Sequence, residues 1–557
     1  MKTRLAPASA VMALFVVLLC VCAWPMHALA SESGEDTVFE TVEEANTAES
    51  VDDTQEAGAT PEAIATPEVN ATQETNAAGN PAPTNAPSST DPSTTPAAPA
   101  TTNAPEASPV AVSLTRSSGG DTEALSYGSY ELAASFDPGE TLTVSAQDGS
   151  TLGSLYVKWY AIPGPWTLRY NDASGQSHQQ SCGQNDFLHE YIVLEGSGAT
   201  SCELSFPNGA EACTLDAYTP GAAPAGVQTW NPPCDKADFL VCSTHADDEI
   251  LWLGGVLATY TGGRGLATQV AYMTNYWNGD VRREHEKLDG LWAIGVRNYP
   301  VNASFEDVYA EDLETAQAIY NQDEVSAFFT GLVRRFKPLV VVCQDFAGEY
   351  GHGGHQVLAL AVQEAVDKGA DAMFCSDTAQ TYGTWDVPKT YYHLYDQNRI
   401  TLDLHQPIAN LGGMTAIEAQ QNAYEKHTSQ QWTWFYVSDD PNDPYASQIN
   451  CSEFGLYRST VGPDTSNDML EHVTTYEEQE AAAEQEAQLS SVEADATEGA
   501  ESGQTGESEE HSQASASENE SRTSAEATGL RIPIYVIALI VALVIVAVAC
   551  LVLLIIH

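Results

Sequence analysis

The pattern of hydrophobic and polar positions changes along the chain and predicts two folded regions. In the first, residues 120–220, short apolar runs are separated by turns rich in Gly, Pro, Asn and Asp. This spacing is typical of a small β-sandwich, and we expect an all-β sandwich over residues 119–222. Its seven expected strands cover residues 130–135, 141–145, 154–160, 166–170, 191–194, 201–206 and 213–218.

The second folded region begins near residue 235, where apolar runs alternate with longer helical stretches. This alternation is typical of an α/β fold, Rossmann-like with a mostly parallel sheet, and we expect it over residues 235–465. The expected strands cover residues 237–242, 267–273, 338–343 and 372–376, and the expected helices cover residues 249–260, 281–295, 311–335 and 354–368.

Both ends of the chain carry an apolar segment. Residues 1–30 combine two early basic residues with an apolar core and the ending Ala-Leu-Ala, the pattern of a secretory signal peptide. Residues 532–556 carry no charge and exceed the roughly 20 apolar residues that cross a bilayer, so we expect a C-terminal transmembrane helix. With the signal cleaved, the protein is a single-pass protein of the cell membrane. Cleaved or not, the folded domains are expected to be extracellular.

The charge of the chain is strongly acidic, with a formal net charge of −56. Much of the acid lies in two low-complexity segments, residues 31–118, rich in Pro, Thr and Ala, and residues 474–530, rich in Glu, Ala and Ser. Neither can bury enough apolar surface to offset chain entropy, so we expect both to be disordered, the second as a stalk. The acidity also argues against nucleic acid as a partner.

Eight of the eleven cysteines lie in the exported region between the two apolar segments. Disulfides can form in that compartment, and the chain has no CxxC pair that would indicate a thiolate zinc site or a redox motif. Cysteines in apolar runs are expected to be buried thiols, and the others can pair. The first group is Cys242, Cys343 and Cys375; the second is Cys182, Cys202 and Cys213 in the sandwich, and Cys234 and Cys451 at the two ends of the α/β region.

Candidate metal ligands follow two of the expected strands. His245, Asp247 and Asp248 come directly after the apolar run 239–242. A strand that ends there places them at the carboxyl edge of the sheet, where open α/β folds bind ligands. Aspartates in such a turn are also ordinary helix caps and first-turn residues, so this turn alone is a weak indication of a site.

A second group, Tyr350, His352 and His355, follows the run 338–343 and is expected at the same edge. Two imidazoles and one carboxylate can bind a divalent cation and leave a position open for water, whose pKa the cation lowers. A further carboxylate can act as general base, and a histidine and a tyrosine hydroxyl can stabilise an oxyanion. An isolated HxxH pair is common by chance, but two groups that follow strands in this order indicate a hydrolase.

These motifs resemble the LmbE-like, or PIG-L, family of metal-dependent N-deacetylases, whose hallmarks are His-Pro-Asp-Asp-Glu after the first strand and a later His-x-x-His. The chain has His-Ala-Asp-Asp-Glu at 245–249 and His-Gly-Gly-His at 352–355, and the similarity extends over residues 235–465. Arg-Glu-His-Glu at 283–286 is similar to the family's Arg-x-x-Glu helix. His-Thr-Ser-Gln at 427–430 is similar to its His-x-Ser-Gln segment.

The resemblance implies a role for each candidate residue. Two of these roles have an alternative: Arg283 can be an ordinary exposed helix arginine instead of a substrate contact, and Fe²⁺ can replace Zn²⁺ as the metal. The implied roles are zinc ligands for His245, Asp248 and His355, general base for Asp247, assistance at the tetrahedral intermediate for His352 with Tyr350 beside it, and substrate binding for Arg283.

Two departures from the family pattern affect this site. Ala246 replaces the usual proline, which should loosen the turn without removing a ligand. Gly353 and Gly354 replace the common Pro-Asp pair, so the carboxylate that often accompanies the two histidines is absent. Asp345 is a candidate to replace that carboxylate.

The expected sandwich resembles, more loosely, the discoidin-like or carbohydrate-binding modules of exported bacterial enzymes, through residues 155–160 and 165–168. Trp159 and Trp166 lie in these runs, and aromatic rings of this kind can stack on sugars. Tryptophans at strand positions are more often part of a core. Glycan binding and a spacer role therefore both remain open for this domain.

The combined prediction is an exported zinc hydrolase that removes an N-acetyl group from N-acetylglucosamine-type sugars of a surface or environmental glycan. Its expected partners are that glycan and, through the C-terminal helix, the membrane; nucleic acid is not expected. One alternative is a hydrolase of another amide with the same site. Others are a catalytically inactive glycan-binding surface protein and an iron oxygenase with two histidines and one carboxylate.

Overall fold

The computed structural model describes residues 105–276, 279–444 and 450–501, with side chains up to residue 488. The expected signal peptide, the expected transmembrane helix and most of the expected N-terminal linker lie outside these residues. Among the helices that are described, none is long and apolar enough to span a bilayer.

Residues 112–218 form the predicted β-sandwich. All its strand pairs are antiparallel, in two sheets of order β1-β3-β8-β5-β6 and β2-β9-β4-β7. Trp159 and Trp166 are buried in its core with their rings 5.6 Å apart, so neither is available to a sugar. The strands are β1 Val112–Arg116, β2 Ala134–Phe136, β3 Glu140–Ala146, β4 Ser154–Trp159, β5 Trp166–Asn171, β6 Ser177–Cys182, β7 His189–Val193, β8 Ser201–Phe206 and β9 Ala210–Tyr218.

Two strands of the sandwich differ from the prediction. β1 lies inside the expected linker 31–118, so the domain begins before residue 119. β6, with the sequence Ser-His-Gln-Gln-Ser-Cys, was not predicted because only Cys182 is buried in it. An edge strand with two polar faces has no hydrophobic alternation to detect.

The second domain is the predicted α/β fold, built on a seven-stranded sheet of order β12-β11-β10-β13-β14-β16-β15. The first five strands in this order run parallel, and β16 is antiparallel to both of its neighbours. The strands are β10 Phe239–Ser243, β11 Thr268–Asn275, β12 Val301–Glu306, β13 Val340–Cys343, β14 Lys389–His393, β15 Arg399–Thr401 and β16 Glu453–Ser459.

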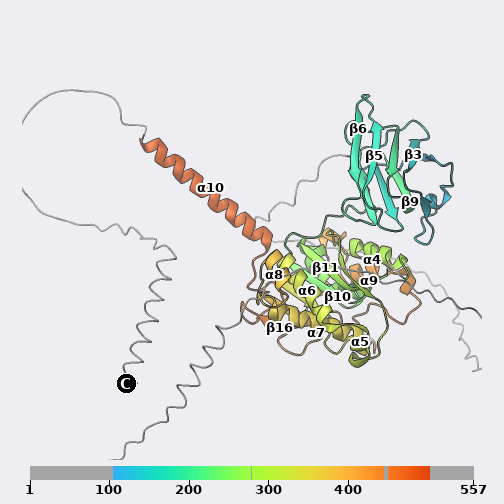
Figure 1. Ribbon diagram of the computed structural model, residues 1–557. Helices are drawn as coiled ribbons and strands as arrows, with labels where there is room; N and C mark the ends of the chain where they lie inside the picture. Colours follow the sequence, from blue (N-terminus) through green and yellow to red (C-terminus); the bar gives the residue numbers. More distant parts are fainter. Residues whose placement is uncertain (1–104, 277–278, 445–449, 502–557) are drawn as a thin grey trace, which may run out of the picture. The chain divides into compact units, whose positions relative to one another are not determined.

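Helices cover both faces of this sheet, as Figure 1 shows for α4 and α9 on one face and α6 and α7 on the other. Successive β10 residues point to opposite faces: Phe239 and Val241 join one core, and Leu240 and Cys242 join the other. The helices are α2 Asp248–Leu251, α3 Gly254–Val256, α4 Arg282–Ala293, α5 Leu313–Ile319, α6 Gln322–Phe336, α7 Gly353–Lys368, α8 Ser376–Tyr382 and α9 Ala416–Tyr424.

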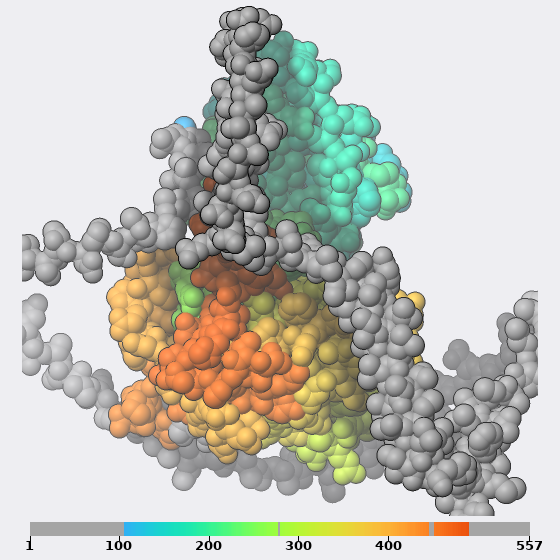
Figure 2. Space-filling view, turned by 90° about the vertical axis from the view of Figure 1, so that its left-hand side faces the viewer, coloured from blue at the N-terminus to red at the C-terminus, as the bar shows by residue number. Residues whose placement is uncertain are grey.

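Three elements of this domain depart from the prediction. The expected strand 372–376 is a turn that leads into α8, and Cys375 there is only half-buried. The expected helix 249–260 consists of α2, α3 and a π-helical segment, η2 Leu257–Gly262, and the expected helix 311–335 is divided into α5 and α6. Parts of the segments after residue 400, orange in Figure 2, form much of the face of the domain that is turned to the viewer.

A helix replaces the first part of the expected disordered stalk. α10 covers Tyr476–Glu501, and its sequence is rich in Ala, Glu and Gln, which have high helix propensity. Its start has the reciprocal bonds of a capping box: the Glu478 amide donates to Thr475 Oγ1 at 3.3 Å, and the Thr475 amide donates to the Glu478 carboxylate at 2.8 Å.

Every cysteine within the described residues carries a free thiol. The pairings considered for the sandwich and for the ends of the α/β domain are therefore not formed. Cys242 and Cys343 are fully buried on neighbouring strands, as expected for thiols in the core.

Candidate functional site

The two predicted motifs meet at the carboxyl edge of the sheet. β10 and β13 are parallel neighbours with Cys242 opposite Cys343, so the loops that follow them emerge side by side. A direct contact joins the loops, because Gln344 Oε1 accepts hydrogen bonds from the amide and the hydroxyl of Thr244, at 2.8 and 2.7 Å. The parallel register thus brings together residues a hundred positions apart.

Three candidate ligand atoms form a compact triangle at this edge. His245 Nδ1 and His355 Nε2 lie 2.8 and 3.1 Å from Asp248 Oδ2, and 3.1 Å from each other. All three side chains are buried, so three lone-pair donors converge away from solvent. This set of two imidazoles and one carboxylate fits a divalent cation such as Zn²⁺.

His352 gives a second possible ligand set, because nitrogens of His245, His352 and His355 lie within 4.8 Å of one another. We favour the set with Asp248, since its atoms are closer together. His352 also has a competing role as the N-cap of α7, in which its Nδ1 accepts from the Gly354 amide at 3.0 Å.

Neighbouring residues fix the ligands in place. Asp248 accepts from the His245 amide at 2.9 Å and from Trp252 Nε1 at 3.0 Å. Burial alone would raise the pKa of Asp248, but His355 and His245 outweigh it and hold that pKa well below its ordinary value. His245 also contacts Asp307, with 3.3 Å between Nε2 and Oδ1.

Glu349 supplies the carboxylate behind the second histidine motif, where Asp345 was expected. Its Oε2 lies 2.9 Å from His355 Nδ1, and its Oε1 lies 3.0 Å from His393 Nδ1. Burial would raise the pKa of Glu349, but the hydrogen bonds with both histidines lower it to about 2. Asp345 instead accepts from the amide of Ala347. Outer carboxylates of this kind orient a ligating histidine.

Asp247 lies beside the ligand triangle in a strained turn. Its φ of 124° is rare for a residue with a side chain, and such strain is often found at functional sites. Burial raises the pKa of Asp247, although Arg283 Nη2, 3.1 Å from Oδ1, acts in the opposite direction. A raised pKa favours proton uptake by this carboxylate, as a general base requires.

Arg283 is 13 % exposed, so it is not the freely exposed helix arginine of the alternative interpretation. Its guanidinium donates to Ala246 O as well as to Asp247, and it contacts Asp307 at 3.4 Å. It lies over the ring of Tyr276, 4.3 Å from the centroid. These contacts make Arg283 a positioning residue for Asp247 that also lines the cavity described below.

Two hydrogen-bond donors face the same site. Burial, together with His245 and His355, lowers the pKa of His352 to about 3, so its imidazole is neutral. Because Nδ1 accepts from Gly354, the hydrogen must lie on Nε2. Burial and the nearby Asp248 raise the pKa of Tyr350, so its phenol stays protonated, and its ring centroid is 5.7 Å from that of His352.

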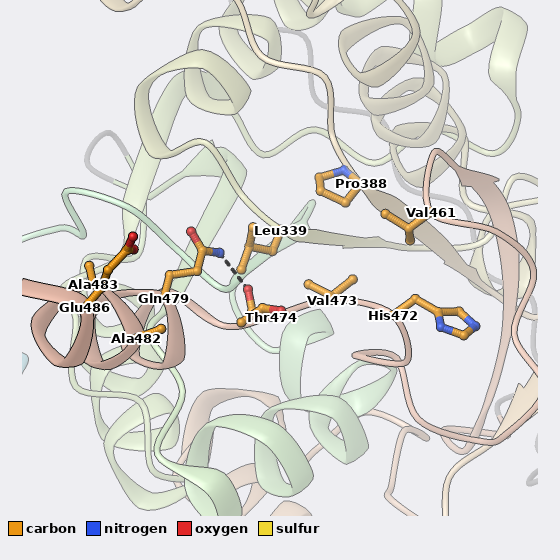
Figure 3. A pocket seen from close by; sticks show the side chains of 10 residues that line it. All are labelled: Leu339, Pro388, Val461, His472, Val473, Thr474, Gln479, Ala482, Ala483 and Glu486. Atoms are coloured by element: carbon orange, nitrogen blue, oxygen red, sulfur yellow. Dashed lines mark hydrogen bonds between the residues drawn. The ribbon is translucent and has the colours of Figure 1, made fainter. Parts of the chain in front are cut away.

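These groups line a cavity of about 220 Å³. Its lining includes all of the predicted site residues except His355. A larger hollow of about 570 Å³ lies beside the start of α10, with His472 and Glu486 at its opposite ends (Figure 3). Its lining is mainly aliphatic and has no cluster of acid and base groups. The small cavity is lined by His245, Asp247, Asp248, Arg283, Asp307, Tyr309, Tyr350, His352, Gln430 and Phe435.

The segment 427–430 joins the site through α4. Glu286 accepts from the Ser429 amide at 2.8 Å, which ties the Arg-x-x-Glu helix to the His-x-Ser-Gln segment and sets Gln430 at the cavity. His427 is fully buried beside Glu249, with 3.7 Å between Nε2 and Oε1.

The sequence analysis missed Asp307 and Glu349. Asp307 follows β12 at the same carboxyl edge, but the strand sequence Val-Asn-Ala-Ser-Phe-Glu has too few apolar residues to be recognised. Glu349 stands three residues before His352, and only the folded loop shows that it contacts His355.

The fold and the site define an α/β domain in which two histidines and a carboxylate converge at the end of the parallel strands. Residues 240–366 match the family model described as PIG-L: GlcNAc-PI de-N-acetylase. The match covers both motifs and Arg283.

Several known proteins are similar to part of the chain. One is 1D-myo-inositol 2-acetamido-2-deoxy-alpha-D-glucopyranoside deacetylase 1 of Catenulispora acidiphila, 24% identical over 199 residues, which are 31% of this chain and 61% of the relative. Deacetylase 2 of the same description from Saccharopolyspora erythraea is 25% identical over 28% of this chain and 64% of the relative. The chain thus spans less than two thirds of these curated relatives.

A solved structure, N,N'-diacetylchitobiose deacetylase from Pyrococcus horikoshii, aligns with 18% identity and a TM-score of 0.27, over 36% of this chain and 72% of that one.

Proposed function

We propose that the α/β domain is a metal-dependent N-deacetylase of N-acetylglucosamine-type sugars. The observation that carries this proposal is the convergence of His245, Asp248 and His355 on one point, with Asp247 beside them in a small cavity. The PIG-L match and the curated deacetylases support the same chemistry.

In the proposed reaction, His245, Asp248 and His355 would hold Zn²⁺, with Fe²⁺ as the alternative. A cation of this kind polarises an amide carbonyl and makes water a better nucleophile near neutral pH. Asp247 accepts a proton from the attacking water and transfers it to the leaving amine. Arg283 contacts Asp247 at 3.1 Å and keeps its carboxylate oriented.

The developing negative charge on the carbonyl oxygen is met by two donors of this chain. His352 offers Nε2–H, and Tyr350 offers its hydroxyl. A neutral donor held by its surroundings stabilises an oxyanion without a reorganisation cost at the moment of reaction. The N-cap bond with Gly354 fixes the tautomer that this role requires.

The proposed setting is outside the cytoplasm, at the cell membrane, on a surface or environmental glycan. This part of the proposal is supported by the expected signal peptide and transmembrane helix. Trp159 and Trp166, the candidate glycan-binding residues of the sandwich, are both buried and cannot stack on a sugar. This supports a spacer role for the domain.

Metal content and acetate release, measured on the full chain, test the proposal. His355→Ala removes a ligand, so bound zinc by elemental analysis should fall together with acetate release from N-acetylglucosamine oligomers. Asp247→Asn should keep the metal and lose about two or more orders of magnitude in rate, the usual size of a general-base contribution. Full metal in His355→Ala, or near-normal turnover in Asp247→Asn, would contradict these roles.

A further inference from the structure

A strip of aromatic side chains lies at the mouth of the candidate cavity. In the segment Trp432-Thr-Trp-Phe-Tyr436 the burial alternates: Trp432, Trp434 and Tyr436 are 84, 55 and 42 % exposed, whereas Phe435 turns inward and lines the cavity. Residues 431–434 form a turn and a bend, and the cavity-lining residues Gln430 and Phe435 stand on either side of them in the chain, so the exposed rings lie next to the cavity lining. We call these three residues the aromatic strip.

Ring contacts connect this strip to the reacting groups. Trp434 lies 4.5 Å from Phe435 and 6.1 Å from Tyr350, measured between ring centroids. Tyr350 in turn lies 5.7 Å from His352 and 5.5 Å from His355. Trp434 is therefore continuous with the wall of the cavity, and a ligand that extends from the cavity toward it meets an exposed aromatic ring.

Two strongly exposed tryptophans call for an explanation. An isolated exposed apolar side chain is ordinary, but two exposed tryptophans two positions apart, one of them in contact with the cavity wall, mark a binding surface. Flat aromatic faces with a polar edge match the apolar C–H face and the hydroxyl rim of a pyranose ring.

The cavity is too small to hold a long ligand. Its volume of about 220 Å³ is below the roughly 300–1,000 Å³ of pockets that enclose drug-sized ligands. It suits one sugar ring with its acetamido group, so any further rings of the substrate must lie outside this cavity.

The charge of the segment identifies the kind of glycan. Residues 430–438 contain no Lys or Arg, and Asp439 and Asp440 follow directly. Phosphate, sulfate and carboxylate groups are usually bound by paired basic side chains. Arg283, the basic residue of the cavity lining, already contacts Asp247 and Asp307. The surface therefore favours an uncharged sugar chain.

We propose that the aromatic strip binds the sugar rings next to the acetylated one, so that the substrate is a neutral oligosaccharide or polysaccharide. This inference rests on the proposed deacetylase function and adds to it a length-dependent specificity. Trp432 and Trp434 stack on the neighbouring rings, while the acetamido group enters the cavity.

The test compares N-acetylglucosamine oligomers of one to five residues with the full-length, metal-loaded protein. For the wild type, kcat/KM for acetate release should rise with chain length. Trp434→Ala should lower the ratio of pentamer to monomer kcat/KM by about tenfold, mainly through KM. Trp434→Phe should restore most of it, because an aromatic face returns. Tyr382→Ala, an exposed ring on α8, is the matched control and should leave the ratio at the wild-type value.

A ratio that does not change in Trp434→Ala, or a wild type that prefers uronic acid-containing or phosphorylated glycans, would overturn the inference and leave the deacetylase proposal intact. Calorimetric titration with the pentamer separates the two proposals. If no oligomer releases acetate but pentamer binding still weakens in Trp434→Ala, the deacetylase function fails and the glycan-binding role of the aromatic strip stands.

Discussion

His352 shows how one residue can belong to two chemical roles. Its ring lies 4.7 Å from that of His355 and 4.9 Å from that of His245, close enough for it to be counted with the ligands. Its Nδ1 is nevertheless occupied by the Gly354 amide, which leaves only Nε2 for the site. If His352 binds the metal, replacing it lowers the metal content of the protein. If His352 donates to the oxyanion, replacing it leaves the metal content unchanged.

We expect His352→Ala to keep its zinc and to lower kcat by roughly 10²- to 10³-fold, the effect of losing one oxyanion donor. Elemental analysis and steady-state kinetics on the same preparation measure both quantities. His352→Asn is the matched control, because asparagine is a good N-cap and keeps α7 in place without the imidazole donor. Loss of zinc in both variants would identify His352 as a ligand instead.

At the scale of elements, the site depends on how closely the start of α7 packs against the loop before α5. A Cβ added to Gly353 would lie 1.9 Å from Asp312 O and 2.9 Å from Ala316 Cβ. The glycine that replaces the common proline of the family pattern is therefore required by this contact, since no larger residue fits without moving the backbone.

Gly353→Ala should push the first turn of α7 away from the loop and displace the histidines at both ends of the motif. We expect lower bound zinc, lower activity and a lower melting temperature, measured by elemental analysis, acetate release and calorimetry. Gly331→Ala in α6 is the control, because the added Cβ meets only Thr378 at 3.4 Å and alanine favours a helix. Equal behaviour of the two variants would contradict the packing argument.

Elements with a clear hydrophobic period were predictable from the sequence, and the others were not. β10 and β13 are buried on both sides and read as continuous apolar runs, so the loops that carry His245 and His355 were placed correctly. β12 and β6 have few buried apolar residues, so neither strand has the hydrophobic pattern from which a strand is predicted. Thr475 and Glu478 form a capping box at the start of α10, but the acidic, low-complexity composition of this segment led to a prediction of disorder.

At the scale of the whole molecule, the stability of this acidic chain depends on pH through its carboxylates that form ion pairs. Glu140 in the sandwich is one of them. Its hydrogen bonds with Arg116, at 2.8 Å to each oxygen, lower the pKa of Glu140 to about 2. The ordinary value is 4.5, so the folded state favours the ionised form.

The stabilisation from Glu140 is fully present above pH 4.5 and is lost as the pH falls to about 2. We expect Glu140→Gln to melt below the wild type at pH 6 and the difference to shrink steadily between pH 4.5 and 2. Calorimetry of the full chains at a series of pH values measures it. A difference that stays constant with pH would show that the ion pair does not contribute through ionisation.

α10 sets a length scale for the protein. Its 26 residues, at about 1.5 Å each, separate its two ends by about 39 Å. The first turn is tied to the α/β domain, where the Tyr476 hydroxyl donates to Lys337 O at 2.6 Å and its amide donates to Asp238 at 2.9 Å. A helix that is anchored at one end keeps its other end at a fixed distance, which a disordered linker does not. The C-terminal end of the helix, Glu501, is thus held about 39 Å from the point where the chain leaves the α/β domain.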